Sequence, residues 1–94
     1  MENRQAQNAH VIALVLGRLK AELQAAQRLA REILEHRDYA DKISAPVYLV
    51  TRFRLEHDTI PMLEKLIRDI EHSEGDALAV ERWSLEHPGE ELTS

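Results

Sequence analysis

Residues 9–33 read AHVIALVLGRLKAELQAAQRLAREI, and this stretch decides the fold of the chain. Its apolar residues recur in alternating steps of three and four, which is typical of a helix packed lengthwise against another helix. The repeat begins at Ala9 and includes Ala30, and the predicted self-association seam within it consists of Ile12, Leu16, Leu19, Leu23, Ala26 and Ile33. Between Val11 and Leu16 the helix is apolar nearly all round, so we expect this part to be covered on several sides.

A row of small residues follows the same helix at intervals of four: Ala9, Ala13, Gly17, Ala21 and Ala25. Rows with this spacing form ridges that let a second helix cross at close range. The alternative is that alanine is simply common in helices. Gly17 favours close packing, because glycine inside a helix costs ~1 kcal/mol relative to alanine.

The composition predicts one soluble globular domain over residues 1–94, with 44% hydrophobic and 31% charged residues. The ends, residues 1–5 and 88–94, are expected to be flexible. The absence of cysteine excludes disulfides and thiolate metal sites and favours the cytoplasm. The longest apolar run, residues 9–17, is too short for a bilayer, which needs ~20 residues, and no basic segment precedes it as in a signal peptide. We therefore expect no membrane partner.

The net charge of −5 argues against nucleic acid as a partner, because nucleic acids select basic surfaces. Residues 38–94 carry thirteen acidic and six basic residues, so a protein partner guided by charge is expected to present a basic surface. A DNA-binding dimer remains as a third hypothesis, after the two developed below. It would read DNA through Arg18, Lys20, Arg28 and Arg31.

The first helix is expected from about Gln5 to Arg37, followed by a polar loop over residues 38–43. Ser44 is expected to cap the next helix, with Pro46 in its first turn, where the missing N–H is harmless. Residues 47–54, VYLVTRFR, contain β-branched and aromatic residues that favour strands. Because no second strand-like run exists in the chain, we predict a helix there. A strand paired across a dimer is the alternative.

Two further breaks are predicted in the second half of the chain. Asp58 and Thr59 precede Pro61, which indicates a kink or a restart of the helix. The run SEGD at residues 73–76 indicates that the helix ends there and that Asp76 caps a short last helix through Leu85.

Four of the five histidines follow Leu-Glu or Ile-Glu just before a predicted break: His36, His57, His72 and His87. A histidine near a helix C-terminus interacts favourably with the exposed carbonyls and the helix dipole, so we interpret these residues mainly as helix ends. His57 also continues the apolar line of Val50, Phe53 and Ile60 and is expected to face the core. A pH-sensitive contact at an interface is the alternative for His57.

The second hypothesis for function is a metal-binding helical bundle with the ligands Glu32, His36, His57 and His72. Helical di-iron proteins use Glu-x-x-His, but no glutamate lies three residues before any histidine here. Nucleophilic catalysis lacks a cysteine and a serine in a glycine-flanked turn, and three glycines do not form a phosphate-binding loop. We therefore predict no catalytic residue, no metal site and no cofactor.

The predicted architecture is all-α: a long N-terminal helix, a kinked antiparallel helix folded back on it, and a short C-terminal helix. At ~1.5 Å per residue the first helix is ~50 Å long, which exceeds a compact monomer with a radius of gyration near ~12 Å. A homodimeric bundle of two hairpins is the simplest way to cover it. A monomeric three- or four-helix bundle is the alternative.

A small, acidic and helical chain without catalytic motifs is expected to work by binding another protein. The main hypothesis is a cytoplasmic regulator or adaptor that forms a homodimer and inhibits or sequesters its partner. The side chains expected to contact that partner are Tyr48, Arg52, His57 and Trp83, because aromatic and arginine side chains dominate the binding energy of interfaces. Core packing is the alternative for both aromatic residues.

Overall fold

The computed structural model describes residues 3–35 and 45–92, and every regular element in these ranges is helical. α1 spans Arg4–Glu35, α3 spans Ala45–Arg54, a π-helical turn (η1) spans Leu55–Thr59, and α4 spans Ile60–Glu86. The all-α prediction is thus confirmed, and residues 47–54 form a helix rather than a strand. The loop expected at residues 38–43 and the cap expected at Ser44 lie outside the described residues. No helix in the described ranges is long and apolar enough to cross a membrane.

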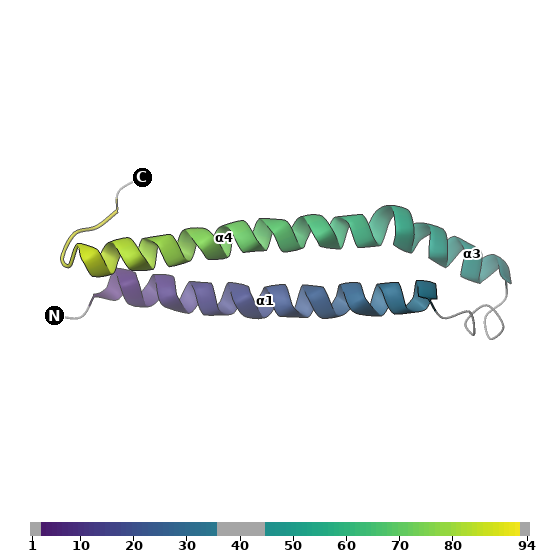
Figure 1. Cartoon of the computed structure of the whole chain (residues 1–94), viewed down its shortest axis with the longest axis horizontal. Helices are drawn as coiled ribbons and strands as arrows, with labels where there is room; N and C mark the ends of the chain where they lie inside the picture. Colours follow the sequence, from purple (N-terminus) through teal and green to yellow (C-terminus); the bar gives the residue numbers. More distant parts are fainter. Residues whose placement is uncertain (1–2, 36–44, 93–94) are drawn as a thin grey trace. The chain divides into compact units, whose positions relative to one another are not determined.

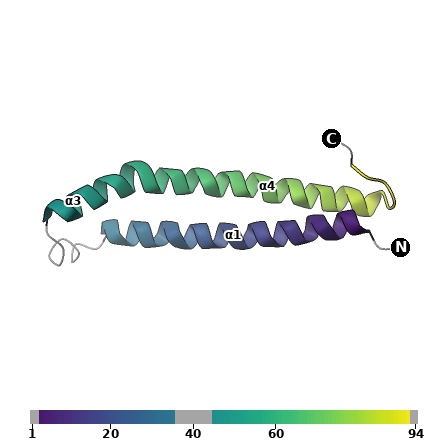
Figure 2. The same ribbon diagram turned by 180° about the vertical axis from the view of Figure 1, so that it is seen from behind.

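The chain divides into two compact units, each with a part of α1 and a part of α4. The first unit holds residues 1–20 and 68–94, and the second holds residues 21–67. In the first unit α1 and α4 lie side by side and antiparallel (Figure 1), since Asn3 contacts Ser84 and Lys20 contacts Glu74. In the second unit α1 also lies beside α4 (Figure 2), where Arg31 and Glu64 form an ion pair. The predicted packing of the long helix against an antiparallel second helix is confirmed.

Small residues form the core of the first unit. α1 buries Ala6, Ala9 and Ala13, and α4 buries Ala77 and Ser84. Steps of three and four join the residues on α1, so their side chains lie on one helix face. Side chains of this size let the two helix backbones approach closely. The row of small residues therefore contributes to packing in its first half, whereas Ala21, farther along, is exposed.

Larger side chains form the core of the second unit, where Tyr48, Ile60 and Ile67 are buried. The half-buried Leu55 lies seven residues after Tyr48, but Ile60 follows Leu55 by five. The π-helical turn accommodates this longer step, because the Ile60 N–H donates to the Leu55 carbonyl. The chain thus stays helical just before Pro61, where the sequence predicts a kink or restart.

The predicted break at residues 73–76 is wrong. α4 continues from Ile60 to Glu86, so no separate short C-terminal helix exists in the described part of the chain. Gly75 does not adopt a positive φ and sits within the helix. The inward positions of α4 continue in steps of three and four through Ile70, Glu74 and Ala77, and this packing offsets the ~1 kcal/mol that glycine costs in a helix.

Among the described histidines of this pattern, His87 confirms the interpretation as a helix end. α4 ends at Glu86, and the Nδ1 atom of His87 lies 2.9 Å from the Trp83 carbonyl oxygen. A turn follows in which the Glu90 N–H donates to the His87 carbonyl and Gly89 takes a φ of 84°. The interpretation is wrong for His72, which lies inside α4, and for His57, because helix continues after it. His36 lies outside the described residues.

Candidate protein-interaction face

Five large aliphatic side chains of α1 are exposed in the first unit, and three of them share one helix face; the five are Val11, Ile12, Leu14, Val15 and Leu19. Ile12, Val15 and Leu19 are 53%, 60% and 43% exposed. They are separated by steps of three and four residues, so they share one face of the helix, which we call the α1 face. Single exposed apolar residues are common on proteins, whereas three on one helix face form an apolar patch, which makes the α1 face a candidate interaction surface.

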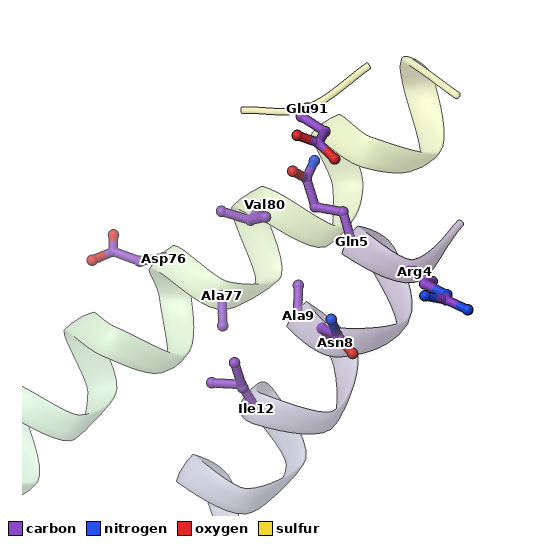
Figure 3. A pocket seen from close by; sticks show the side chains of 9 residues that line it. All are labelled: Arg4, Gln5, Asn8, Ala9, Ile12, Asp76, Ala77, Val80 and Glu91. Carbon is purple, nitrogen blue, oxygen red and sulfur yellow. The ribbon is translucent and has the colours of Figure 1, made fainter. Parts of the chain in front are cut away.

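A groove of about 550 Å³ lies beside the α1 face, between α1 and α4 of the first unit. Ile12 projects toward it, and the small side chains of Ala9 and Ala77 leave it open (Figure 3). Val80 adds to its apolar lining, whereas Asp76 and other polar residues lie at its edge. An apolar lining with a polar edge suits an apolar side chain of another helix better than a polar ligand.

The predicted self-association seam is divided between two environments. Leu16, Leu23 and Ile33 are half-buried, and Ala9 and Ala30, which continue the same apolar repeat, are buried. Ile12, Leu19 and Ala26 are exposed. Part of the seam thus packs within the chain, and the exposed part of the first unit belongs to the α1 face. Sequence reasoning treated the two sets as one line, because both follow steps of three and four.

A different groove lies on the other side of the first unit and carries a polar contact. His10 Nδ1 lies 2.7 Å from Glu81 Oε2, and both residues line this groove together with Val11 and Leu85. Leu85 is as exposed as the residues of the α1 face. It therefore provides a matched control for substitutions on that face.

Hydrogen bonds join the start of α1 to the end of α4, and sequence reasoning missed them. The Asn3 side chain accepts a bond from the Ala6 N–H, which caps α1, and donates to the Ser84 carbonyl. Gln5 Nε2 donates to the Ser84 hydroxyl over 2.6 Å, and Gln5 Oε1 accepts from the Leu92 N–H. The preference of asparagine for helix caps could have identified Asn3. The Gln5–Ser84 bond spans 79 positions and leaves no local pattern.

Basic residues of α1 are partly neutralised by α4. Lys20 Nζ lies 2.9 Å from Glu74 Oε1, and this hydrogen bond raises the pKa of Lys20 above its ordinary 10.5. Arg31 forms an ion pair with Glu64 at 2.9 Å. Two of the four cations of the DNA-binding hypothesis are therefore already paired with carboxylates, and this weakens the case for a free basic face.

The four residues expected to contact a partner differ in accessibility. Tyr48 is buried, and Arg52 donates to Glu56 over 3.0 Å, which raises the pKa of Arg52. His57 is exposed and its ring lies 4.5 Å from that of Phe53, so the prediction that it faces the core is wrong. Trp83 is half-buried and stacks on His87 with 4.4 Å between ring centroids. Trp83 belongs to the first unit and the other three to the second.

The described residues contain no cluster of three or more histidine, aspartate or glutamate side chains that could hold a metal ion. Of the ligands in the metal hypothesis, His36 lies outside the described ranges, and His57 and His72 belong to different units. The residues that the structure describes therefore supply no geometry that favours this hypothesis.

Comparisons of the chain with models of known protein families, with curated proteins and with solved structures find no match.

Proposed function

We propose that the chain is a non-enzymatic protein-interaction module that forms a homodimer through the α1 face and, as a dimer, binds and modulates another protein in the cytoplasm. The observation that carries the proposal is the exposure of Ile12, Val15 and Leu19 on one face of α1, next to an apolar groove. Water-exposed aliphatic side chains in this arrangement gain free energy when a second helix covers them.

A second copy of the chain fits this surface because the surface has both projecting side chains and a groove that can receive them. Large side chains project from the α1 face, and small alanines leave the groove open beside them. A two-fold contact requires such a self-complementary patch. With the two-fold axis at Val15, the middle of the face, two α1 helices run antiparallel. Leu19 of one copy then lies at the level of Ile12 in the other, beside the groove.

The expected affinity follows from the area that remains exposed. Full burial of an aliphatic side chain stabilises by about 1.5–3 kcal/mol, and about half of each side chain of the α1 face is still accessible. Six such side chains in two copies contribute roughly 5–9 kcal/mol before the cost of association is subtracted. We therefore expect a dimer that dissociates on dilution rather than a permanent one.

The experiment is a measurement of molar mass against concentration for the native chain, Val15→Asp and Leu85→Asp. At micromolar concentrations the native chain and Leu85→Asp should approach twice 10.8 kDa, whereas Val15→Asp should stay at 10.8 kDa because a dimer would bury its charge. Both residues are exposed, so both variants should retain their helix content by circular dichroism. A native mass of 10.8 kDa at every concentration, or equal behaviour of the two variants, would refute the homodimer.

The binding of another protein is the second half of the proposal. The half-buried Trp83 supports it, because a partly accessible aromatic ring suits the centre of an interface. Affinity capture with the native chain, Trp83→Ala and Leu85→Ala tests this point. A stoichiometric partner that is retained by the native chain and Leu85→Ala but lost with Trp83→Ala is the expected result. Recovery of the same partner with all three would show that Trp83 does not contact it.

A further inference from the structure

A second apolar face lies on α3, in the other unit of the chain. Leu49, Val50 and Phe53 are each more than half exposed. Together with Arg54 and Asp58 they line a groove of about 520 Å³, which we call the α3 groove. Tyr48 and Ile60 face the core of this region, whereas these three side chains are not covered by any described part of the chain.

The π-helical turn separates the exposed residues from the buried ones. Leu55 and Ile60 both turn toward the core although they lie five residues apart. Three residues between them are exposed: Glu56, His57 and Asp58. His57 is one of the three, and its ring contacts Phe53 at a tilt of 42°. The turn thus adds an aromatic neighbour to Phe53 on the surface. Such insertions in helices frequently occur at functional sites.

The two charges of the α3 groove have no partners among the residues that the structure describes. In the described ranges, neither Arg54 nor Asp58 forms an ion pair or a hydrogen bond through its side chain. Arg52, two residues before Arg54, does pair with Glu56 and does not line the groove. One cation and one anion therefore remain unpaired beside three exposed apolar side chains.

We propose that the α3 groove binds the α3 groove of a second copy, with Arg54 of each copy opposite Asp58 of the other. A two-fold contact needs a patch that complements itself, and a patch with one unpaired cation and one unpaired anion meets this condition. Arg54 and Asp58 are four residues apart, about 6 Å along the helix. An axis through their midpoint brings both ion pairs together at once. Phe53, the neighbour of Arg54, then packs near the axis.

This contact goes beyond the proposed dimer and does not depend on it, because the α1 face and the α3 groove share no residue. Few side chains take part, so the contact is smaller than the ~800 Å² per partner of stable complexes and is expected to be weak. A chain that uses both contacts associates beyond a dimer as its concentration rises.

The test measures mass by sedimentation equilibrium from micromolar to millimolar concentrations in the Val15→Asp background, in which the α1 face cannot pair. Val15→Asp should be a monomer of 10.8 kDa at micromolar concentrations and should associate reversibly toward twice that mass only as the concentration approaches the millimolar range. Arg54→Asp and Asp58→Arg, each added to it, place like charges opposite each other and should weaken association about tenfold or more. An equimolar mixture of the two should restore it, since each chain then supplies the charge that the other lacks. Arg52→Asp is the matched control and should leave it unchanged.

Three results would overturn this proposal: no association of Val15→Asp at millimolar concentration, no loss with Arg54→Asp, or no recovery in the mixture. Equal losses with Arg54→Asp and Arg52→Asp would also overturn it, because the effect would then follow net charge and not the groove. These readouts separate the contact from the α1 face. If Val15→Asp has the same mass as the native chain at every concentration while Arg54→Asp has a lower mass, the homodimer through the α1 face is refuted and the α3 contact is supported.

Discussion

Gly75→Ala tests whether α4 is one continuous helix, which is the point at which the fold departs most clearly from sequence expectation. Gly75 lies in the interior of α4 and does not adopt a positive φ. A Cβ atom added there meets no atom within 4 Å. The substitution therefore changes helix propensity and the entropy of the unfolded chain, and it changes no tertiary contact.

The expected gain is close to the full difference between glycine and alanine in a helix, about 0.8–1 kcal/mol. For a chain of this size, that raises Tm by roughly 4–8 °C. Gly17→Ala gives an internal comparison, because its Cβ atom would come 2.7 Å from Glu74 Oε2 and displace that carboxylate. Glu74 accepts a hydrogen bond from Lys20, and loss of this ion pair offsets part of the gain in helix propensity. Gly17→Ala should therefore gain less than Gly75→Ala.

The assay is urea unfolding and thermal unfolding followed by far-UV circular dichroism, at one protein concentration for all variants because association shifts stability. A higher Tm for Gly75→Ala than for the native chain is the expected result. If the helix instead ended at residues 73–76, Gly75 would take a left-handed conformation and alanine there would be destabilising by ~1 kcal/mol. A lower Tm would therefore refute the continuous α4.

Three further predictions concern the ends and the charges of the first unit. Gly89 has a φ of 84°, which is unfavourable for a residue with a side chain, so Gly89→Ala should destabilise the turn after α4 by ~1 kcal/mol. The Leu92 amide, which donates to Gln5, should then exchange its hydrogen faster. An unchanged exchange rate would contradict this prediction. Ser84→Ala and Gln5→Ala should each lower the free energy of unfolding by ~0.5–1.5 kcal/mol, because each removes the hydrogen bond between the two side chains. A double-mutant cycle should give a coupling energy of at least ~0.5 kcal/mol between them. Additive losses would mean that this hydrogen bond contributes nothing to stability. The hydrogen bond to Glu74 raises the folded-state pKa of Lys20, so its stabilisation is fully present below pH 10.5 and is lost as the pH rises through the folded-state value. Lys20→Met should remove this part of the pH dependence of Tm, and the same alkaline fall in both proteins would exclude it.

The helical architecture was predictable because its determinants are local and repeated. The steps of three and four over residues 9–33 identify α1, and Pro46 in a first turn is compatible with the start of α3 at Ala45. The end of α4 was predictable from the Leu85-Glu86-His87 run. These features need no knowledge of what lies opposite each helix.

The errors arose where the outcome depends on tertiary packing. A glycine beside polar residues indicates a helix end by local rules, yet packing of α4 against α1 carries the helix through Gly75. The face of α1 that turns inward is the alanine face of Ala6 and Ala13, although Ile12 is more apolar than either. Close approach of two helices requires small side chains, and hydrophobicity alone does not rank them first. His57 was misplaced because the π-helical turn inserts a residue that period-based reasoning does not anticipate.

The candidate interface was only partly predictable for the same reason. Ile12 and Leu19 were expected in a self-association seam and are exposed, but Val15, at the centre of the α1 face, was not in that seam. Its place becomes apparent only once Leu16, the next residue, is seen to turn toward α4. The sequence pattern identified the helix that carries the candidate interface but not the angular position of the exposed face.

The most direct test of the central claim, that a second copy covers the α1 face around Val15, is oxidation of single-cysteine variants. The chain contains no cysteine, so Val15→Cys and Leu85→Cys each introduce one defined thiol. A disulfide requires Cα atoms about 4.4–6.8 Å apart, which two copies reach at Val15 only if the two-fold axis passes there. We predict rapid and nearly complete formation of a covalent dimer by Val15→Cys under mild oxidation, and little by Leu85→Cys. Equal or faster dimerisation of Leu85→Cys would contradict the account.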